Sequence, residues 1–244
     1  MRRFLLICAC LTALIRAQAQ LNVQLHYDYG HLTDNLSTRP SVTSTIEYFG
    51  TDRWGSTFFF NDMDYYHDGS AGAYWEISRN INLWKASPLA LHLEYNGGAN
   101  INQDYETGTR IQHAVLAGGQ WSWHNTDFTR TFSMQLLYKY FFKGANGAKA
   151  FNSVQTTAVW GMEFFDRKLT FSGYADLWYS RPINNVVFLS EPQLWLNIYR
   201  FKGCEDIKLS VGGEVEVSNN FIYPKNGTNN RFYAIPTTAV KWTF

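Results

Sequence analysis

The stretch that decides the fold is Ser41–Trp84, SVTSTIEYFGTDRWGSTFFFNDMDYYHDGSAGAYWEISRNINLW. It contains three runs in which apolar and polar side chains alternate, separated by the breaks Gly50–Arg53 and His67–Ser70. The middle run places two aromatic rings and two carboxylates on one face: Phe58, Phe60, Asp62 and Asp64. Alternation with a period of two predicts β-strands. A strand with one apolar face and one acidic face fits a barrel whose outside meets lipid and whose inside meets water.

The same alternation recurs in about twelve runs, each about as long as a tilted membrane strand needs to be. The clearest is Phe128–Phe142, where Met134 and Leu136 oppose Ser133 and Gln135. We expect longer polar connections after odd-numbered runs, such as Gly97–Arg110 after the fifth, and short turns after even-numbered ones. The sequence therefore predicts an all-β fold, a transmembrane antiparallel β-barrel of about 12 strands with short periplasmic turns and longer extracellular loops. An even strand count places both termini on the periplasmic side of the outer membrane of a Gram-negative bacterium.

The first residues have the pattern of a secretory signal. Arg2 and Arg3 precede an apolar segment, and Ala17-Gln18-Ala19 forms a small-residue cleavage site. We expect residues 1–19 to be a signal peptide and residues 20–244 to form the barrel. A lipoprotein signal at Cys10 is the weaker alternative, because the apolar stretch before it is short.

The composition fits a membrane barrel and disfavours a nucleic-acid partner. Aromatic residues make up 17% of the 244 residues, as do charged residues, and the net charge is only +1. There is no cluster of Lys and Arg of the kind that binds nucleic acid. After removal of the signal, the remaining cysteine is Cys204, which cannot form an internal disulfide.

Two segments carry a resemblance to known proteins. The C-terminal run Ala239–Phe244 resembles the signal by which the barrel assembly machinery recognises outer-membrane barrels, with Phe244 as its last residue. The segment Ile46–Leu83, with its FFFNDMD and YWEISR runs, resembles the Tsx-like nucleoside-specific channels. That resemblance implies a narrow, monomeric channel in outer-membrane lipid that binds nucleosides along an aromatic and polar lumen. It implies no catalytic residues, no cofactor and no metal.

The alternation assigns a set of side chains to the lumen, where carboxylates could accept hydrogen bonds from solutes and aromatic rings could stack on them. The predicted lumen and solute-binding residues are Glu47, Phe58, Phe60, Asp62, Asp64, Tyr74, Glu76, Arg79, Glu94, Asp176, Trp195 and Glu214. Strict alternation from Glu76 would leave Arg79 facing lipid, which costs about 2–4 kcal/mol at the midplane. We therefore expect a β-bulge near Ser78 that turns Arg79 inward, toward Glu76 or Glu94.

Other functions fit parts of the same pattern. A secreted β-sandwich also has alternating strands, but with the apolar face as its core. A plugged structural or surface-interaction barrel would use the luminal charges only to hold itself closed. Asp62, Asp64, His67 and Asp68 could also form a rim hydrolase site or a calcium site, although the spacing does not match an EF-hand.

Overall fold

Alternating sequence produces long strands that pair with their neighbours along the chain. The structure, a computed structural model, describes residues 18–102, 108–144, 147–222 and 230–244. The strands are β1 (Gln18–Asp28), β2 (Val42–Asp52), β3 (Gly55–Tyr65), β4 (Ala71–Asn82), β5 (Leu89–Ile101), β6 (Gly108–His124), β7 (Arg130–Phe141), β8 (Phe151–Phe164), β9 (Leu169–Ser180), β10 (Asn185–Ser190), β11 (Gln193–Asn197), β12 (Leu209–Asn219) and β13 (Phe232–Thr243). Short 3₁₀ helices that lie wholly within the described residues are η2 (Gly30–Leu32), η3 (Asp34–Leu36) and η5 (Ile198–Arg200).

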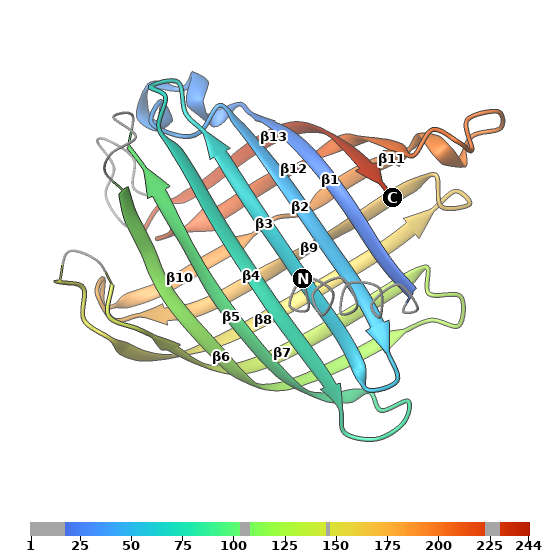
Figure 1. Ribbon diagram of the computed structural model, residues 1–244, viewed down its shortest axis with the longest axis horizontal. Helices are drawn as coiled ribbons and strands as arrows, with labels where there is room; N and C mark the ends of the chain where they lie inside the picture. Colours follow the sequence, from blue (N-terminus) through green and yellow to red (C-terminus); the bar gives the residue numbers. More distant parts are fainter. Residues whose placement is uncertain (1–17, 103–107, 145–146, 223–229) are drawn as a thin grey trace, which may run out of the picture.

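The sheet closes on itself because β1 pairs with both β2 and β13. Val23 of β1 lies opposite Ile46 on one side and Trp242 on the other. All pairings are antiparallel, and the strands tilt around a common axis, with β2–β4 in front of β8 and β9 (Figure 1). Closure leaves no unpaired strand edge, as a barrel in lipid requires. None of the helices in the described ranges is long and apolar enough to cross a membrane.

The barrel has 12 strands, as predicted, because β10 and β11 are two halves of one strand. Both halves pair with β9 and β12, and the register runs on unchanged from Ser190, opposite Ala175, to Gln193, opposite Ser172. Pro192 lies at the break. Proline has no N–H to donate to the ladder, so the hydrogen bonding is interrupted while the strand direction is kept.

Most apolar side chains of the wall point outward and most polar ones point inward. Leu25 is 50% exposed and Leu136 is 64% exposed, whereas their neighbours Gln24 and Gln135 are 2% and 8% exposed. A soluble barrel or sandwich has the opposite distribution, with its apolar face buried. The secreted-sandwich alternative is therefore excluded, and the outer surface is of the kind that lipid covers.

Aromatic side chains gather at both ends of this outer surface, as they do at the two interfaces of a bilayer. We call the end where β1 begins and β13 ends the terminal rim, and the opposite end the distal rim. Exposed aromatic residues near the terminal rim include Trp54, Trp84, Trp121, Trp123, Phe128, Phe165 and Trp242. Those near the distal rim include Tyr27, Tyr29, Tyr65, Tyr138, Tyr179 and Phe232. The band between the two groups is the membrane-spanning part of the wall.

Several expected connections differ from the structure. Gly97–Arg110 was expected to be a long polar loop, but β5 continues to Ile101 and β6 begins at Gly108, while residues 103–107 lie outside the described residues. The expected alternation of connection lengths fails after β3, whose connection 66–70 is no longer than the connection 83–88 after β4. It fails again after β9, where residues 181–184 form a tight turn, while residues 198–208 form a long connection after β11. Asn184 allows the tight turn because it adopts a left-handed φ of 49° and accepts a hydrogen bond from the Tyr179 hydroxyl.

The predicted bulge near Ser78 is wrong. The register of β4 against both β3 and β5 is unbroken through this region, with Ser78 opposite Phe58 and Glu94. The register shift lies instead between β5 and β6, between Asn96 and Gly98. A side chain at Gly98 would meet the backbone oxygen of Ala73 at 2.5 Å, so this irregular position accepts only glycine without movement.

Candidate functional site: the barrel lumen

The inner face of the barrel brings together eleven of the twelve predicted site residues. Strand registers place Glu47, Phe60 and Glu76 side by side on β2, β3 and β4. They also place Trp195 beside Thr170 and Glu214 beside Gln193. The predicted site residues on the inner face are Glu47, Phe58, Phe60, Asp62, Asp64, Tyr74, Glu76, Glu94, Asp176, Trp195 and Glu214.

Arg79 is the exception, because it points outward. With no bulge, it stays on the same side of β4 as Ile77 and Ile81, which are 48% and 37% exposed. Its guanidinium lies 2.8 Å from Asp52 Oδ1 and donates to Thr57 Oγ1 at 3.0 Å. Asp52 is the last residue of β2, so this charge pair is at the terminal rim rather than at the membrane midplane. The cost that motivated an inward Arg79 does not arise there.

The wall formed by β2, β3 and β4 carries hydrogen-bonded carboxylates. Thr43 donates to Asp64 at 2.6 Å, and Thr45 donates to Asp62 at 2.5 Å. The Tyr74 hydroxyl donates to Glu76 at 2.6 Å. These hydrogen bonds hold the carboxylates in fixed positions. The carboxylates are only partly buried, so they remain in contact with the water-accessible interior.

The opposite wall repeats this arrangement. Thr157 of β8 donates to Asp176 of β9 at 2.5 Å, and Gln193 of β11 donates to Glu214 of β12 at 3.0 Å. Glu191, at the break between β10 and β11, bonds to the Tyr174 hydroxyl. Each carboxylate is thus oriented by a donor on its own or the neighbouring strand.

The two walls face each other across the lumen. Asp62 of β3 interacts electrostatically with Glu214 of β12, and Glu76 of β4 interacts with Asp176 of β9. In the ribbon, β3 and β4 lie in front and β9 lies behind (Figure 1). Carboxylates of the two walls therefore face each other across the barrel interior.

Aromatic rings lie on the same inner face of β3 and β4. The ring centroids of Phe58 and Phe60 are 5.9 Å apart, and those of Phe60 and Tyr74 are 6.0 Å apart. All three are partly exposed and point into the lumen. This series of rings offers successive surfaces on which a planar solute can stack.

Two lysines balance part of the acidic charge from within the wall. Lys139 of β7 donates to Gln155 at 2.7 Å and lies 4.7 Å from the ring centroid of Trp178. Lys241 of β13 lies 4.0 Å from the ring centroid of Trp195. Both ammonium groups are held against aromatic faces, a favourable cation–π arrangement. Lys241 was missed from the sequence, although period-two alternation with Trp242 would have placed it inside.

A third cation comes from a connection. Arg39, in residues 29–41, contacts Asp28 of β1 at 2.8 Å and Glu216 of β12 at 2.9 Å. Burial alone would lower the pKa of Arg39, but the nearby charges of Glu216 and Asp28 outweigh burial and raise it. The guanidinium therefore fixes this connection to the inner wall near the distal rim. No sequence pattern marks this residue, because its partners lie far away along the chain.

Part of the interior is packed rather than open. Trp195 and Leu137 are fully buried although they point inward. Leu137 packs with Ala114 and Leu116 in an apolar cluster, which Phe141 extends. Side chains of β7 and β11 therefore fill part of the lumen, and Trp195 does so directly beside β9.

The residues of the alternative rim site are divided between wall and turn. Asp62 and Asp64 lie on β3, where they accept hydrogen bonds from threonines of β2. Asp68 instead accepts hydrogen bonds from Ser70 within the connection 66–70. The His67 ring lies 5.2 Å from the ring of His31. Across the parts of the chain that the structure describes, no three His, Cys, Asp or Glu side chains could hold a metal ion.

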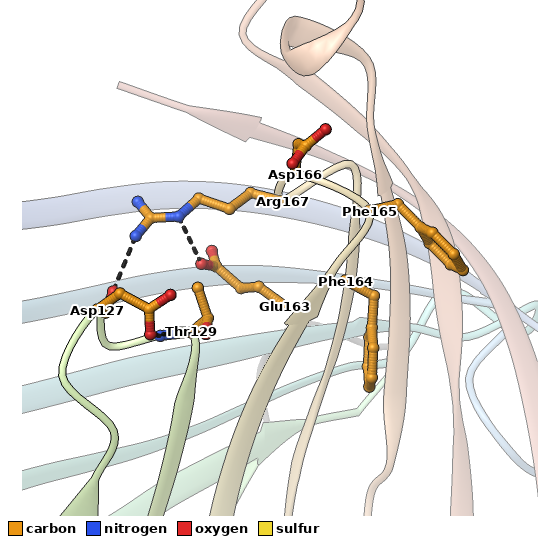
Figure 2. Close-up of a pocket in the computed structure, with 7 residues that line it drawn as sticks. All are labelled: Asp127, Thr129, Glu163, Phe164, Phe165, Asp166 and Arg167. Atoms are coloured by element: carbon orange, nitrogen blue, oxygen red, sulfur yellow. Dashed lines mark hydrogen bonds and ion pairs between the residues drawn. The ribbon is translucent and has the colours of Figure 1, made fainter.

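A separate small cavity of about 420 Å³ lies at the terminal rim, between the turns 125–129 and 165–168 (Figure 2). Arg167 crosses it, contacting Glu163 at 3.0 Å and donating to the backbone oxygen of Asp127 at 2.9 Å. Phe165, Asp166 and Arg167 all adopt left-handed φ values, between 54° and 66°. The predicted site residues are not among those that line this cavity, so it is distinct from the carboxylates of the lumen.

The fold and site define a closed antiparallel barrel with a lipid-type exterior and a charged interior. The chain belongs to the family described as "Domain of unknown function (DUF5020)", which matches residues 19–244. This description does not mention nucleoside channels, so the Tsx-like resemblance remains a prediction. No curated protein sequence matches the chain.

Among solved structures, the chain is similar to barrels of low sequence identity. The KdgM porin is 10% identical, with a TM-score of 0.46 over 92% of this chain and 99% of that one. The KdgM porin in complex with disordered oligogalacturonate is 11% identical, with a TM-score of 0.47 over the same shares. LpxR from Salmonella typhimurium is 8% identical, with a TM-score of 0.45 over 92% of this chain and 100% of that one. At these identities and scores, the likeness carries no information about solute or activity.

Proposed function

We propose that this protein is a passive outer-membrane channel for small polar solutes, with nucleosides as the preferred class. The observation that carries the proposal is that partly exposed carboxylates and aromatic rings of β2–β4 and β9 face the lumen. A passive channel has no chemical step. Its selectivity comes from pore width, stacking and hydrogen bonding.

The chemistry of these side chains fits a nucleoside. Stacking of a base on an aromatic side chain contributes about 1–3 kcal/mol, and Phe58, Phe60 and Tyr74 form a series of such rings. Carboxylates such as Asp62 and Glu76 can accept hydrogen bonds from ribose hydroxyls and base amino groups. Several weak sites in series suit transport, because one tight site would hold the solute and block exit.

The proposal includes a membrane setting. The apolar outer band and its two aromatic groups favour insertion in the outer membrane, with the terminal rim facing the periplasm. Phe244 directly follows β13, bonds through its backbone to Leu21 of β1, and would serve as part of the assembly signal. Because the barrel is already closed by the pairing of β1 with β13, a single chain suffices for the channel.

The test is single-channel conductance of the purified protein in a planar bilayer, with nucleosides titrated into the bath. We expect small conductance steps that nucleosides reduce at concentrations where sugars and amino acids have little effect. Asp62→Asn should weaken this reduction. Asp127→Asn, in a turn at the terminal rim, is the matched control and should leave it unchanged.

A plugged structural barrel is the second candidate, favoured by the full burial of Trp195 and Leu137 in the interior. This candidate predicts no conductance from correctly folded protein. Such a result would overturn the channel proposal. Conductance without any preference for nucleosides would keep the channel and reject the nucleoside class.

A further inference from the structure

One buried oxygen in the lumen has no hydrogen-bond partner. It is Oδ1 of Asn96, whose residue is only 4% exposed. Asn96 lies on the inner face of β5, directly opposite Glu76 of β4 in the strand register. An unpaired buried acceptor is unfavourable, and native structures contain few of them. A hydrogen-bond donor brought by a ligand would satisfy it.

The groups around Asn96 are also acceptors. Glu76 interacts electrostatically with Glu94 and Asp176. Each carboxylate has one side-chain donor: Tyr74 for Glu76 at 2.6 Å, His92 for Glu94 at 2.9 Å, and Thr157 for Asp176 at 2.5 Å. An ionised carboxylate offers about four acceptor positions, so these bonds leave capacity for further donors.

The nearby cation does not neutralise this group by direct contact. Lys139 interacts electrostatically with Glu76, Asp176 and Glu94, yet its ammonium bonds to Gln155 and lies against the rings of Phe141 and Trp178. Within the described residues, Lys139 forms no ion pair at 4.0 Å or less. The basic groups near the three carboxylates and the unpaired amide oxygen are therefore Lys139, which is held to one side, and His92, which contacts Glu94 at 2.9 Å.

We propose that Asn96, Glu76, Glu94 and Asp176 form a subsite that receives the protonated primary amine of a solute passing through the lumen. This inference rests on the proposed channel function and adds a second class of solute to it, because a nucleoside carries no protonated amine. Amino acids are disfavoured at the subsite because their own carboxylate is repelled by its acids. A primary ammonium carries one positive charge and three N–H donors, which match carboxylates and an amide oxygen. Anions are repelled by the same carboxylates. A quaternary ammonium has the charge but no N–H, so it can satisfy the electrostatics and not the hydrogen bonds.

The experiment compares two probes of equal charge, propylammonium and trimethylpropylammonium, on folded protein. The first measurement is block of single-channel current in a planar bilayer. The second is equilibrium binding by isothermal titration calorimetry in detergent, which does not require an open pore. We expect propylammonium to act at concentrations about tenfold lower than the quaternary probe in both measurements.

Two variants locate the effect, and one variant controls for it. Asn96→Leu removes the acceptor without changing charge, and Glu76→Gln removes one carboxylate charge. Each should reduce the preference for propylammonium by about tenfold. Asp127→Asn removes a charge in a turn at the terminal rim, outside the lumen, and should leave the preference intact. Folding of every variant is checked by its migration on gels with and without heating.

If propylammonium and trimethylpropylammonium blocked and bound the wild-type protein at equal concentrations, the subsite would be overturned. The presence of single-channel conductance would still support the channel in that case. A lack of conductance would overturn the proposed function, and calorimetry would then decide the subsite alone. Binding of propylammonium that Asn96→Leu does not change would place the amine elsewhere and contradict the assignment of Asn96.

Discussion

Arg39 Nη2 lies 2.9 Å from Glu216 Oε2 and 2.8 Å from Asp28 Oδ2. These contacts join residues 29–41, the connection between β1 and β2 at the distal rim, to β1 and β12 of the barrel wall. The side chains of Asp28 and Glu216 are 5% and 10% exposed. Two buried carboxylates on neighbouring parts of the wall are therefore stabilised by one guanidinium. This contact holds the middle of residues 29–41 against the wall, while backbone hydrogen bonds from Tyr29 to Pro236 and from Ser41 to Tyr65 hold the two ends.

Arg39→Gln should destabilise the barrel by about 3–5 kcal/mol, because it leaves buried carboxylates without their cation. The measurement is urea-induced unfolding from lipid vesicles. Arg53→Gln, in the turn after β2, is the control and should change stability by less than about 1 kcal/mol. If the double variant Arg39→Gln, Glu216→Gln were as unstable as the sum of the two single variants, the two residues would not act as a pair.

The pH dependence of this contact has a definite sign. The pKa of Arg39 is raised above its ordinary value, since the charges of Glu216 and Asp28 outweigh the effect of burial. A raised pKa gives stability that persists below the ordinary value and is lost only as the pH rises through the folded value. Arg39 therefore stays charged between about pH 7 and pH 10, and its contribution to the free energy of unfolding should be constant over that range.

Arg79 and Asp52 form a different kind of pair, on the outer surface at the terminal rim. Their side chains are 29% and 45% exposed, so solvent screens the attraction. Arg79→Leu should change the free energy of unfolding by less than about 1 kcal/mol. It should also leave the reversal potential in a salt gradient unchanged, because the guanidinium does not face the lumen.

The reversal potential is the decisive measurement for Arg79. Glu76→Gln, on the same strand but facing inward, is the matched variant and should shift the potential toward weaker cation preference. A comparable shift in Arg79→Leu would contradict the outward orientation and would restore the luminal role that the sequence predicts.

The periodic features of the sequence were sufficient to predict the wall. Alternation in the segment that became β7 correctly placed Leu136 outside, and alternation in β3 placed Asp62 and Asp64 on one inner face. Period two works here because a strand fixes the direction of every second side chain. The 12-strand count was also predicted, since each strand has its own alternating run.

The failures concern information that period two does not contain. Alternation shows on which face of a strand a side chain lies, but not how far it lies from the membrane midplane. Arg79 was therefore treated as a midplane charge, although it lies opposite Thr57, close to the turn. The anchoring of Arg39 joins residues 177 apart in sequence, which no local pattern reveals. The unpaired oxygen of Asn96 depends on the packing of several strands and becomes visible only in the folded barrel.

Asp127 provides a test of a local contact outside the membrane. Its pKa lies below the ordinary value of 3.8, first because the Thr129 hydroxyl donates to its carboxylate, and also through backbone donors and the charge of Arg167. Thr129→Val should raise the pKa of Asp127 toward 3.8, as followed by NMR titration of the side-chain carboxyl carbon.

Glu205 is an internal control for that titration. Its pKa is also lowered, by backbone hydrogen bonds within the connection 198–208, and Thr129→Val should not change it. The lowered pKa of Asp127 favours the folded state above the ordinary value, and this contribution is lost as the pH falls through the folded value. An Asp127 pKa that stayed unchanged in Thr129→Val would show that the hydroxyl is not the main cause.

Trp195 tests how far side chains limit the lumen. It is fully buried, its indole N–H donates to Gln193 at 2.9 Å, and Lys241 lies 4.0 Å from its ring centroid. Trp195→Ala should destabilise the barrel by about 3–5 kcal/mol, because it removes a large packed side chain. It should also raise single-channel conductance, since the vacated space adjoins the polar side chains of the lumen. Trp195→Phe keeps most of the volume and should conduct nearly as the wild type does. Wild-type conductance in Trp195→Ala would mean that the narrowest point lies elsewhere, with the apolar cluster around Leu137 as the next candidate.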